Sequence, residues 1–477
     1  MIAVSKKLFV RWDKFKDSMS GSFEDLDVPP TLVSFAVTTQ KTKDIVSNEF
    51  KAAGHTVCLI KPELDENGLP TTESLLKHFE LVASLLHSGA AVACYTPGIG
   101  GVAEAVMKMG FGNGLGFAFD SNVSMDDIFG YNYASFVLEM NDHPAVGQVL
   151  GTVTADGAFS YNGEVLQQND LLTAYENKLE SVYSCNISHK EKAMETFSYT
   201  AEKRVAPAVK VAKPRVLIPA FPGTNCEYDS AKVMRDAGAE PEIFVINNLS
   251  ASGIARSVEK FAQALKQSQM VFIPGGFSGG DEPDGSGKFI TAFFRNAAIK
   301  ENVTDLLENR DGLMCGICNG FQALIKLGLV PYGKIIDTDE SCPTLTYNSI
   351  ARHQSRVVHT RIASNKSPWL ALTNVGDVYS VPISHGEGRF LASDELIRQL
   401  AANGQIATQY VDLDNNATRD VHFNPNDSMY AIEGITSPDG RVFGKMGHSE
   451  RIGSGLYKNV PGEFDMRMFE AAVRYFR

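Results

Sequence analysis

The sequence predicts an α/β protein in two main parts, a mixed α/β domain followed by a domain with a doubly wound, mostly parallel sheet. Apolar strand-like segments alternate with segments of helical periodicity along most of the chain. A proline-containing stretch of small residues interrupts this alternation near residue 210. The 477 residues are 44% hydrophobic and 21% charged, close to globular averages, so they can bury sizeable cores.

The chain is acidic, with 44 Lys and Arg against 56 Asp and Glu and a formal net charge of −12. This balance argues against a surface that follows nucleic-acid phosphates. No apolar run of membrane-spanning length is present, and the start of the chain does not resemble a signal peptide. We therefore expect no nucleic-acid partner, no membrane and a cytoplasmic location. The seven cysteines, odd in number and sparsely spaced, predict free thiols.

The clearest break in composition is Ala206–Pro214, which follows a charged stretch, His189–Arg204, without a long apolar pattern. Two prolines among small residues are typical of an interdomain linker. We therefore expect domains over residues 1–185 and 215–477, joined by a linker over residues 186–214.

Before this linker, the apolar pattern predicts strands over residues 31–37, 55–60 and 90–95. Apolar residues repeat at helical spacing between Ser74 and Leu86. The third strand leads through the glycine-rich turn 97–101 into a helix over residues 102–109. Such a turn can present N–H groups to a phosphate, but the Lys-Ser/Thr ending of a phosphate loop is missing, so a tight turn fits at least as well.

After the linker, strands and helices alternate. The predicted strands cover residues 215–220, 242–246, 269–273 and 312–315. One predicted helix ends near residue 237, and two further helices are predicted over residues 289–298 and 321–327. Thr224 and Glu227 have capping-box spacing ahead of the first helix. Repeated β–α units favour a mostly parallel sheet, in which ligands collect at the carboxyl ends of the strands.

The most informative segment is Gly316–Gly320, which carries Cys318 between an apolar strand and a helix. It has the spacing of a nucleophile elbow, glycine-x-nucleophile-x-glycine, with sulfur in place of the serine oxygen. Small flanking residues permit a sharp turn, and the start of a helix favours a thiolate. The alternative is a buried structural cysteine, which is what we expect of Cys315.

A thiolate that attacks an amide or ester needs donors for the developing oxyanion and a base. The loop Pro274–Gly280 and the N–H of Asn319 could supply the donors. Two histidines are each followed by a glutamate two residues later, and these pairs are His385 with Glu387 and His448 with Glu450. A carboxylate near an imidazole fixes its tautomer and stabilises its charge. The spacing alone does not choose between the two pairs.

Together, these segments resemble the class I glutamine amidotransferase domain of the phosphoribosylformylglycinamidine synthase family. The motifs that carry the resemblance occur in the family's order, and they are Val216–Cys226, Pro274–Ser278, Cys315–Gln322, Ser384–Arg389, Asn424–Ser428 and Gly447–Arg451. Several motifs in the right order are far more specific than any one of them. The resemblance implies that this domain hydrolyses glutamine to glutamate and ammonia.

The resemblance also implies a catalytic triad of Cys318, His448 and Glu450, and it thereby chooses the second histidine pair. Cys318 would form a γ-glutamyl thioester, His448 would shuttle protons, and Glu450 would orient His448. Gly447 and Ser449 stand where prolines are usual in the family, but the spacing of His448 and Glu450 is intact.

The remaining implied site residues lie around this triad. Main-chain groups near Gly276, Phe277 and Asn319 would hold the oxyanion, and Gln322 would help to bind glutamine. His385 and Glu387 would form an accessory signature near the active site. No metal is expected there.

Residues 1–185 are similar to the closing half of the family's ATP-dependent synthetase region, through Asp27–Val33 and Gly100–Met109. The preceding ATP- and Mg²⁺-binding halves have no counterpart, so we expect the C-terminal portion of a longer enzyme. The complete enzyme would use glutamine and ATP to convert formylglycinamide ribonucleotide to its amidine in purine biosynthesis. For this reaction, the chain would need the remaining N-terminal synthetase portion as its partner. Glutamine hydrolysis itself would need no cofactor, and this chain alone would not complete the ATP-driven synthesis.

Two alternatives stay open beside this hypothesis. A cysteine hydrolase or deglycase-like α/β protein would also carry a cysteine on an elbow, but it would not predict the ordered motifs. A non-catalytic scaffold that binds glutamine would not need an intact set of Cys318, His448 and Glu450.

Overall fold

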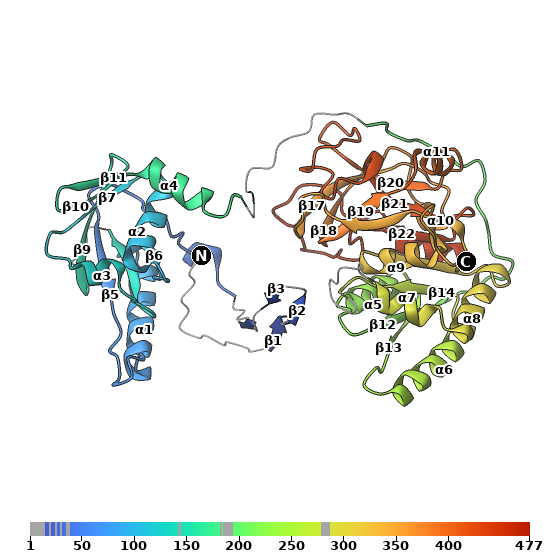
Figure 1. Ribbon diagram of the computed structural model, residues 1–477, viewed down its shortest axis with the longest axis horizontal. Helices are drawn as coiled ribbons and strands as arrows, with labels where there is room; N and C mark the ends of the chain where they lie inside the picture. Colours follow the sequence, from blue (N-terminus) through green and yellow to red (C-terminus); the bar gives the residue numbers. More distant parts are fainter. Residues whose placement is uncertain are drawn as a thin grey trace. The chain divides into compact units, whose positions relative to one another are not determined.

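The computed structural model describes residues 39–141, 145–181, 184, 194–277 and 287–477, with the backbone of four short strands nearer the N-terminus. These strands are β1 (Phe15–Ser18), β2 (Gly21–Phe23), β3 (Leu26–Val28) and β4 (Thr31–Ser34). The chain divides into two compact units, Met1–Asn186 and Ile187–Arg477, each with its own large sheet (Figure 1). Within the described ranges, no helix is long and apolar enough to cross a bilayer.

The first unit is built on a seven-stranded sheet. In spatial order its strands are β11 (Glu164–Gln167), β10 (Ala158–Tyr161), β7 (Gly116–Phe119), β9 (Gln148–Thr154), β5 (Thr56–Ile60), β8 (Phe136–Met140) and β6 (Ala91–Tyr95). All neighbouring strands are antiparallel except β10 and β7. The helical elements of this unit are η1 (Thr42–Asp44), α1 (Thr72–Ser88), α2 (Gly101–Phe111), α3 (Met125–Phe129) and α4 (Gln168–Asn177).

Alternate residues of β5 pack into different layers of the first unit. Val57 and Leu59 belong to an apolar cluster that includes helix α2. Cys58 and Ile60 belong to another cluster, which includes Val82 of helix α1. Because successive side chains of a strand point to opposite faces, α1 and α2 cover opposite faces of the sheet. The predicted strands 55–60 and 90–95 and both predicted helices are confirmed, whereas residues 35–37 of the first predicted strand lie outside the described residues.

The glycine-rich turn before α2 supplies its own hydrogen-bond acceptor. The Gly100 N–H donates to the Glu104 carboxylate at 2.9 Å, one turn into the helix. Gly101 has φ +65°, and a Cβ on it would lie 2.8 Å from the Ile128 carbonyl oxygen. A residue with a side chain would therefore not fit, and these contacts favour the tight-turn interpretation over a phosphate-binding loop.

The second unit is built on a nine-stranded sheet. In spatial order its strands are β13 (Glu240–Val245), β12 (Arg215–Ala220), β14 (Met270–Ile273), β15 (Leu313–Ile317), β22 (Val442–Lys445), β21 (Ile432–Thr436), β20 (Ile406–Val411), β17 (Gln354–Ile362) and β18 (Val378–His385). Strands β13 to β22 in this order are parallel, and the remaining pairs are antiparallel. The predicted parallel sheet holds for the first five strands, and the antiparallel strands after them make the whole sheet mixed.

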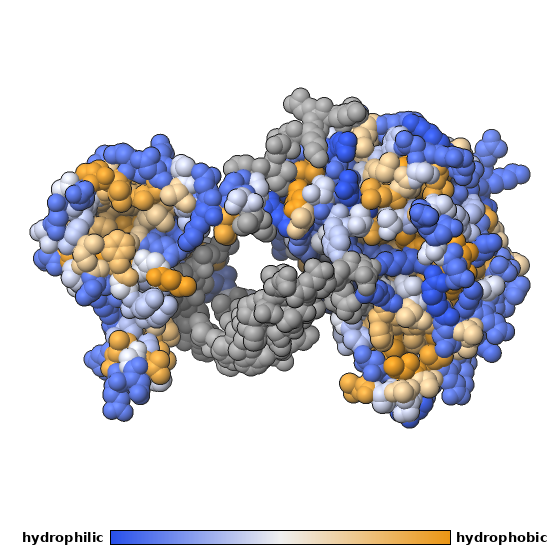
Figure 2. Space-filling view, viewed as in Figure 1, coloured by the Kyte–Doolittle hydropathy of each residue, from blue (hydrophilic) through white to orange (hydrophobic). Residues whose placement is uncertain are grey.

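Helices and a small second ribbon complete this unit. The helical elements are α5 (Glu227–Asp236), α6 (Ala251–Gln267), α7 (Lys288–Phe294), α8 (Ala297–Glu308), α9 (Asn319–Leu327), α10 (Leu329–Tyr332), η2 (Pro368–Leu370), α11 (Asp394–Ala402), η3 (Met429–Ala431) and α12 (Met468–Phe476), and the ribbon pairs β16 (Thr344–Tyr347) with β19 (Glu387–Leu391). One continuous apolar cluster, which includes Phe272, Phe321 and Phe443, forms the core. The visible surface of the unit is mainly hydrophilic, with small apolar groups between (Figure 2).

Two local predictions for the second unit are wrong. Thr224 does not cap a helix, because its hydroxyl accepts the Phe221 N–H at 3.0 Å and α5 begins later, with Cys226 as its N-cap. The helix predicted over 289–298 is broken between α7 and α8. Asn296 caps the second of these helices by accepting the Ala298 N–H at 3.1 Å, so the chain restarts there.

The segment from Met194 onward lies against the second unit. The Met194 N–H donates to the Ala417 carbonyl at 2.9 Å, and the Tyr199 N–H donates to the Ala363 carbonyl at 2.8 Å. Phe197 is buried in the apolar core of this unit. The part of the expected linker that the structure describes is therefore attached along this surface, and the exact domain boundaries stay a prediction.

Packing of helix α9 on strand β22 gives a test of the core. A Cβ on Gly444 would lie 2.1 Å from the ring of Phe321, which is buried in α9. We expect Gly444→Ala to lower the free energy of unfolding by about 1–3 kcal/mol, because a well-packed core has no room for an added methyl group. Urea unfolding followed by tryptophan fluorescence, to which the buried Trp369 contributes, measures this change.

Gly386→Ala is the matched control, since no atom lies within 4 Å of a Cβ built there. It should change the free energy of unfolding by no more than about 0.5 kcal/mol. Equal stabilities of the two variants would contradict the described packing of α9.

Candidate active site

Cys318 occupies the sharp turn between strand β15 and helix α9. Its backbone angles, φ +54° and ψ −108°, lie outside the regions that L-residues favour, which costs about 1–3 kcal/mol. A Cβ on Gly316 would lie 2.6 Å from the Gly320 backbone, and one on Gly320 would lie 2.1 Å from the Ile273 carbonyl oxygen. Both flanking positions therefore require glycine, and the turn has the strand-to-helix geometry of a nucleophile elbow.

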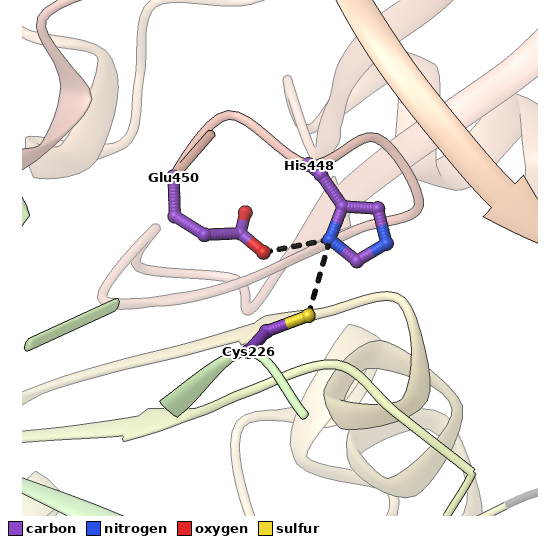
Figure 3. A group of neighbouring side chains, drawn as sticks. All are labelled: Cys226, His448 and Glu450. Carbon is purple, nitrogen blue, oxygen red and sulfur yellow. Dashed lines mark hydrogen bonds and ion pairs between the residues drawn. The ribbon is translucent and has the colours of Figure 1, made fainter. Parts of the chain in front are cut away.

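His448 and Glu450 form a buried pair beside this elbow. Nδ1 of His448 faces Oε1 of Glu450 (Figure 3) at 2.6 Å, and both side chains are almost fully buried. Burial disfavours a charged imidazole, but the Glu450 charge and hydrogen bonds to Cys226, Cys318 and Glu450 outweigh it and raise the pKa of His448 well above its ordinary value. Burial likewise opposes the Glu450 charge, yet the imidazolium lowers the pKa of this carboxyl overall.

The second histidine pair has a different environment. His385 ends strand β18, and its Nδ1 lies 3.2 Å from the Asn348 side-chain oxygen. Its Nε2 has no hydrogen-bond partner among the described residues. Burial, with the nearby charge of His448, lowers the pKa of His385 to about 3, so this imidazole is neutral. Of the two candidate bases, only His448 has a pKa that Cys318 helps to raise, and the Cys318 thiol itself donates to the Ser384 carbonyl at 3.7 Å.

Gln322 and Asn319, in the first turn of helix α9, form a buried hydrogen-bond network. The Asn319 side-chain N–H donates to Gln322 Oε1 at 2.9 Å, and Gln322 Nε2 donates to the main-chain carbonyl of Glu387 at 2.8 Å. This network ties helix α9 to strand β19. Glu387 therefore contacts the predicted glutamine-binding residue through its backbone.

The loop after strand β14 approaches Cys318 closely at Gly275. A Cβ on Gly275 would lie 2.7 Å from His448 Cε1, so only glycine fits between the base and the nucleophile. The Phe277 N–H is already hydrogen-bonded to the Gly223 carbonyl at 2.9 Å, and it is therefore not available to an oxyanion in this arrangement. The Gly276 N–H has no acceptor among the residues that the structure describes. Residues 278–280 of the predicted loop lie outside those residues.

Cys226 is a site residue that the sequence did not single out as functional. Its sulfur is fully buried, 3.8 Å from His448 Nδ1 (Figure 3) and 3.2 Å from a guanidinium nitrogen of Arg451. Cys226 is the N-cap of helix α5 in the segment after strand β12, as Cys318 is the N-cap of helix α9 after β15. The carboxyl ends of parallel strands meet at one edge of a sheet, and this shared position was the available signal.

Cys226, His448 and Glu450 could in principle hold a metal ion. Their ligand atoms lie within 4.8 Å of one another. However, Nδ1 of His448 already bonds to Glu450, and the Arg451 guanidinium places a positive charge beside the sulfur. Those contacts suit proton transfer between side chains better than binding of a cation.

The arrangement as a whole suits covalent acyl transfer. A strained cysteine lies beside a buried histidine, and a carboxylate orients that histidine through Nδ1. Such a group can pass a proton from the attacking thiol to a leaving group.

Comparisons with known proteins identify the family to which the second unit is similar. The family of CobB/CobQ-like glutamine amidotransferase domains matches residues 213–476. The phosphoribosylformylglycinamidine synthase subunit PurQ of Methanococcus maripaludis is 35% identical over 258 residues, 53% of this chain and 87% of the relative. The PurQ subunit of Treponema denticola is 37% identical over 251 residues, 50% of this chain and 88% of the relative.

A solved structure of PurLQS from Thermotoga maritima aligns with 56% of this chain and 100% of its own, at 23% identity and a TM-score of 0.40. The family match covers more than half of the chain and includes both the cysteine elbow and the histidine loop. The chain therefore belongs, through its second unit, to the family of CobB/CobQ-like glutamine amidotransferase domains.

Proposed function

We propose that the second unit hydrolyses glutamine and supplies the ammonia for phosphoribosylformylglycinamidine synthase. The observation that carries this proposal is the buried His448–Glu450 pair beside the strained Cys318. The relatives that cover this unit are named as subunits of that synthase. The ordered family match does not favour a deglycase-like hydrolase or a non-catalytic scaffold.

The proposed reaction proceeds through a thioester. Cys318 first passes its thiol proton to His448, whose charged form Glu450 stabilises, and the thiolate then attacks the side-chain amide carbon of glutamine. The carbon–nitrogen bond then breaks as His448 returns the proton to the leaving ammonia. Water attacks the thioester next, with His448 accepting its proton and returning it to the sulfur as glutamate leaves. Glu450 holds the imidazole through Nδ1 and stabilises its charged form.

Main-chain groups would stabilise the oxyanion in both steps. We assign one donor to the Gly276 N–H and the other to Asn319, the first residue of helix α9, where the helix dipole also favours negative charge. Phe277 contributes by pairing with Gly223, which holds Gly276 in place. Gln322 would contact the substrate through the hydrogen-bonding capacity that its two protein partners leave.

The ammonia would serve an ATP-dependent synthesis in the complete enzyme. In that reaction, formylglycinamide ribonucleotide is converted to the amidine, and ATP with Mg²⁺ activates the acceptor amide. Residues 1–185 would represent part of the synthetase and residues 215–477 the glutaminase, in the cytoplasm. Glutamine hydrolysis by the Cys318 site would itself require no cofactor.

Labelling with a glutamine-like diazoketone tests the site directly. We expect one covalent adduct, located on Cys318 by intact-mass and peptide mapping, and we expect excess glutamine to prevent it. The reason is that the reagent must occupy the glutamine site before the thiol attacks it. Cys318→Ala should abolish the adduct.

Cys342→Ala is the matched control, because Cys342 is partly exposed and lies outside the site. This variant should be labelled like the wild type. Labelling spread over several cysteines without protection by glutamine would instead support a different thiol enzyme or a scaffold.

The buried pair predicts a shift in pH dependence. Glu450→Gln removes the carboxylate that raises the pKa of His448, so the imidazolium should be lost at lower pH than in the wild type. The alkaline limb of the kcat/KM profile for glutamate release should therefore move to lower pH. We also expect kcat to fall on the order of 10²–10⁴-fold, because the histidine loses its orienting partner.

Glu395→Gln, on the surface helix α11, is a charge-matched control and should leave the profile unchanged. An alkaline limb that stays at the wild-type pH in Glu450→Gln would show that Glu450 does not set the charge of His448.

A further inference from the structure

Two fully buried charged side chains, Glu433 and Lys445, lie beneath the loop that carries His448. They come from the neighbouring strands β21 and β22, and their Oε1 and Nζ atoms are 3.1 Å apart, with no exposed surface on either side chain. Removing two charges from water is unfavourable, and an apolar pair of the same size often stabilises a core as well or better. The contacts of this pair with the loop therefore indicate what it does.

The pair holds the residues on both sides of His448. Glu433 Oε1 accepts the Gly447 N–H at 2.7 Å. Lys445 Nζ donates to the Gly447 carbonyl at 3.1 Å and to the Ser449 hydroxyl at 2.9 Å. The main-chain N–H and carbonyl of Gly447, which precedes the histidine, and the hydroxyl of Ser449, which follows it, are thus all bonded to one buried ion pair.

Lys445 also contacts the nucleophile. Its main-chain carbonyl accepts the Cys318 N–H at 2.9 Å. The carboxylate of Glu433 accepts a hydrogen bond from the Thr408 hydroxyl. The main-chain carbonyl of Glu433 accepts the Met446 N–H at 3.2 Å. Lys445 is therefore bonded through its backbone to Cys318 and through its side chain to the loop that carries His448.

The fit of Gly447 shows how closely the loop approaches the pair. A Cβ at this position would lie 3.0 Å from Glu433 Oε1 and 3.2 Å from Lys445 Nζ. It would also lie 2.6 Å from Val381 Cγ1. A larger residue at this position would therefore displace either the loop or the side chains of the pair and Val381.

We propose that Glu433 and Lys445 are positioning residues that set the placement of His448 against Cys318. They do not touch the reacting atoms and act only through the loop and the backbone of the elbow. This inference rests on the proposed glutaminase function and assigns a role to a buried ion pair that the reaction itself does not use.

The test compares the double variant Glu433→Gln/Lys445→Met with the wild type. The double change removes both charges at nearly constant volume and deletes the lysine donors to the loop, without leaving a lone buried charge. We expect a folded protein by circular dichroism and a KM for glutamine within about threefold of the wild type. The kcat should fall by about 10- to 100-fold, because a small displacement of a catalytic group has effects of that size.

A second readout does not depend on glutamine hydrolysis. Alkylation of Cys318 by iodoacetamide, followed by peptide mapping, should slow severalfold in the double variant, since the base is no longer held beside the thiol. Alkylation of the partly exposed Cys342 should keep its wild-type rate in the same sample. Ser449→Ala, which removes only one acceptor of Lys445, should show a smaller decrease in both readouts and covers the case in which the double variant does not fold.

Glu139→Gln provides the control for losing a buried carboxylate, because Glu139 is fully buried in the first unit. Its kcat and its rate of Cys318 alkylation should match those of the wild type. A folded double variant with wild-type kcat and wild-type alkylation would overturn the positioning role. The proposed function would be refuted instead if the wild-type protein did not hydrolyse glutamine and if glutamine did not protect Cys318 from the diazoketone. The alkylation rates would then still decide the role of Glu433 and Lys445.

Discussion

The candidate site depends on the pairing of β15 with β22, two central strands of the nine-stranded sheet. Their register sets Ile317 opposite Lys445, so the residues that follow each strand emerge at the same edge. The Cys318 N–H continues this pairing by one bond to the Lys445 carbonyl. Because successive strand residues point to opposite faces, a slip by one residue would turn the cysteine or the histidine loop away from the other. The chemistry of the site thus follows from a backbone register.

The same edge gathers ionisable groups where water has little access. Among the residues that the structure describes at this edge, two ion pairs have almost no exposed surface, His448 with Glu450 and Lys445 with Glu433. Loss of one partner from a buried pair leaves an uncompensated charge and costs about 3–5 kcal/mol, so each pair strongly favours a single geometry. The first pair belongs to the proposed proton transfers. The pair of Glu433 and Lys445 bonds to the loop that carries His448. Burying its two charges costs free energy, and the same two charges fix the position of the catalytic histidine.

The glycines beside Cys318 show which features of the site could be predicted from neighbouring residues alone. Gly316 and Gly320 could be recognised from spacing, because an elbow excludes side chains at positions defined by the elbow itself. Spacing did not separate His385 from His448, since both precede a glutamate by two residues. In the folded chain, the second histidine bonds to its glutamate, whereas the first lies against an asparagine from another segment. Cys226 lies at the end of one family motif, but its contact with His448 could not be read from the sequence, because His448 lies more than two hundred residues further along the chain.

The sequence by itself determined the α/β class, most strands and helices of the parallel half-sheet and the position of the candidate nucleophile. These features rest on periodicity and turn residues, which act over a few neighbouring positions. Tertiary structure decided the change from parallel to antiparallel strands after β22, the attachment of the segment from Met194 to the second unit, and the bonds of Glu433 and Lys445 to the histidine loop. Each of those depends on partners brought together only by folding, so no local pattern in the chain could specify them.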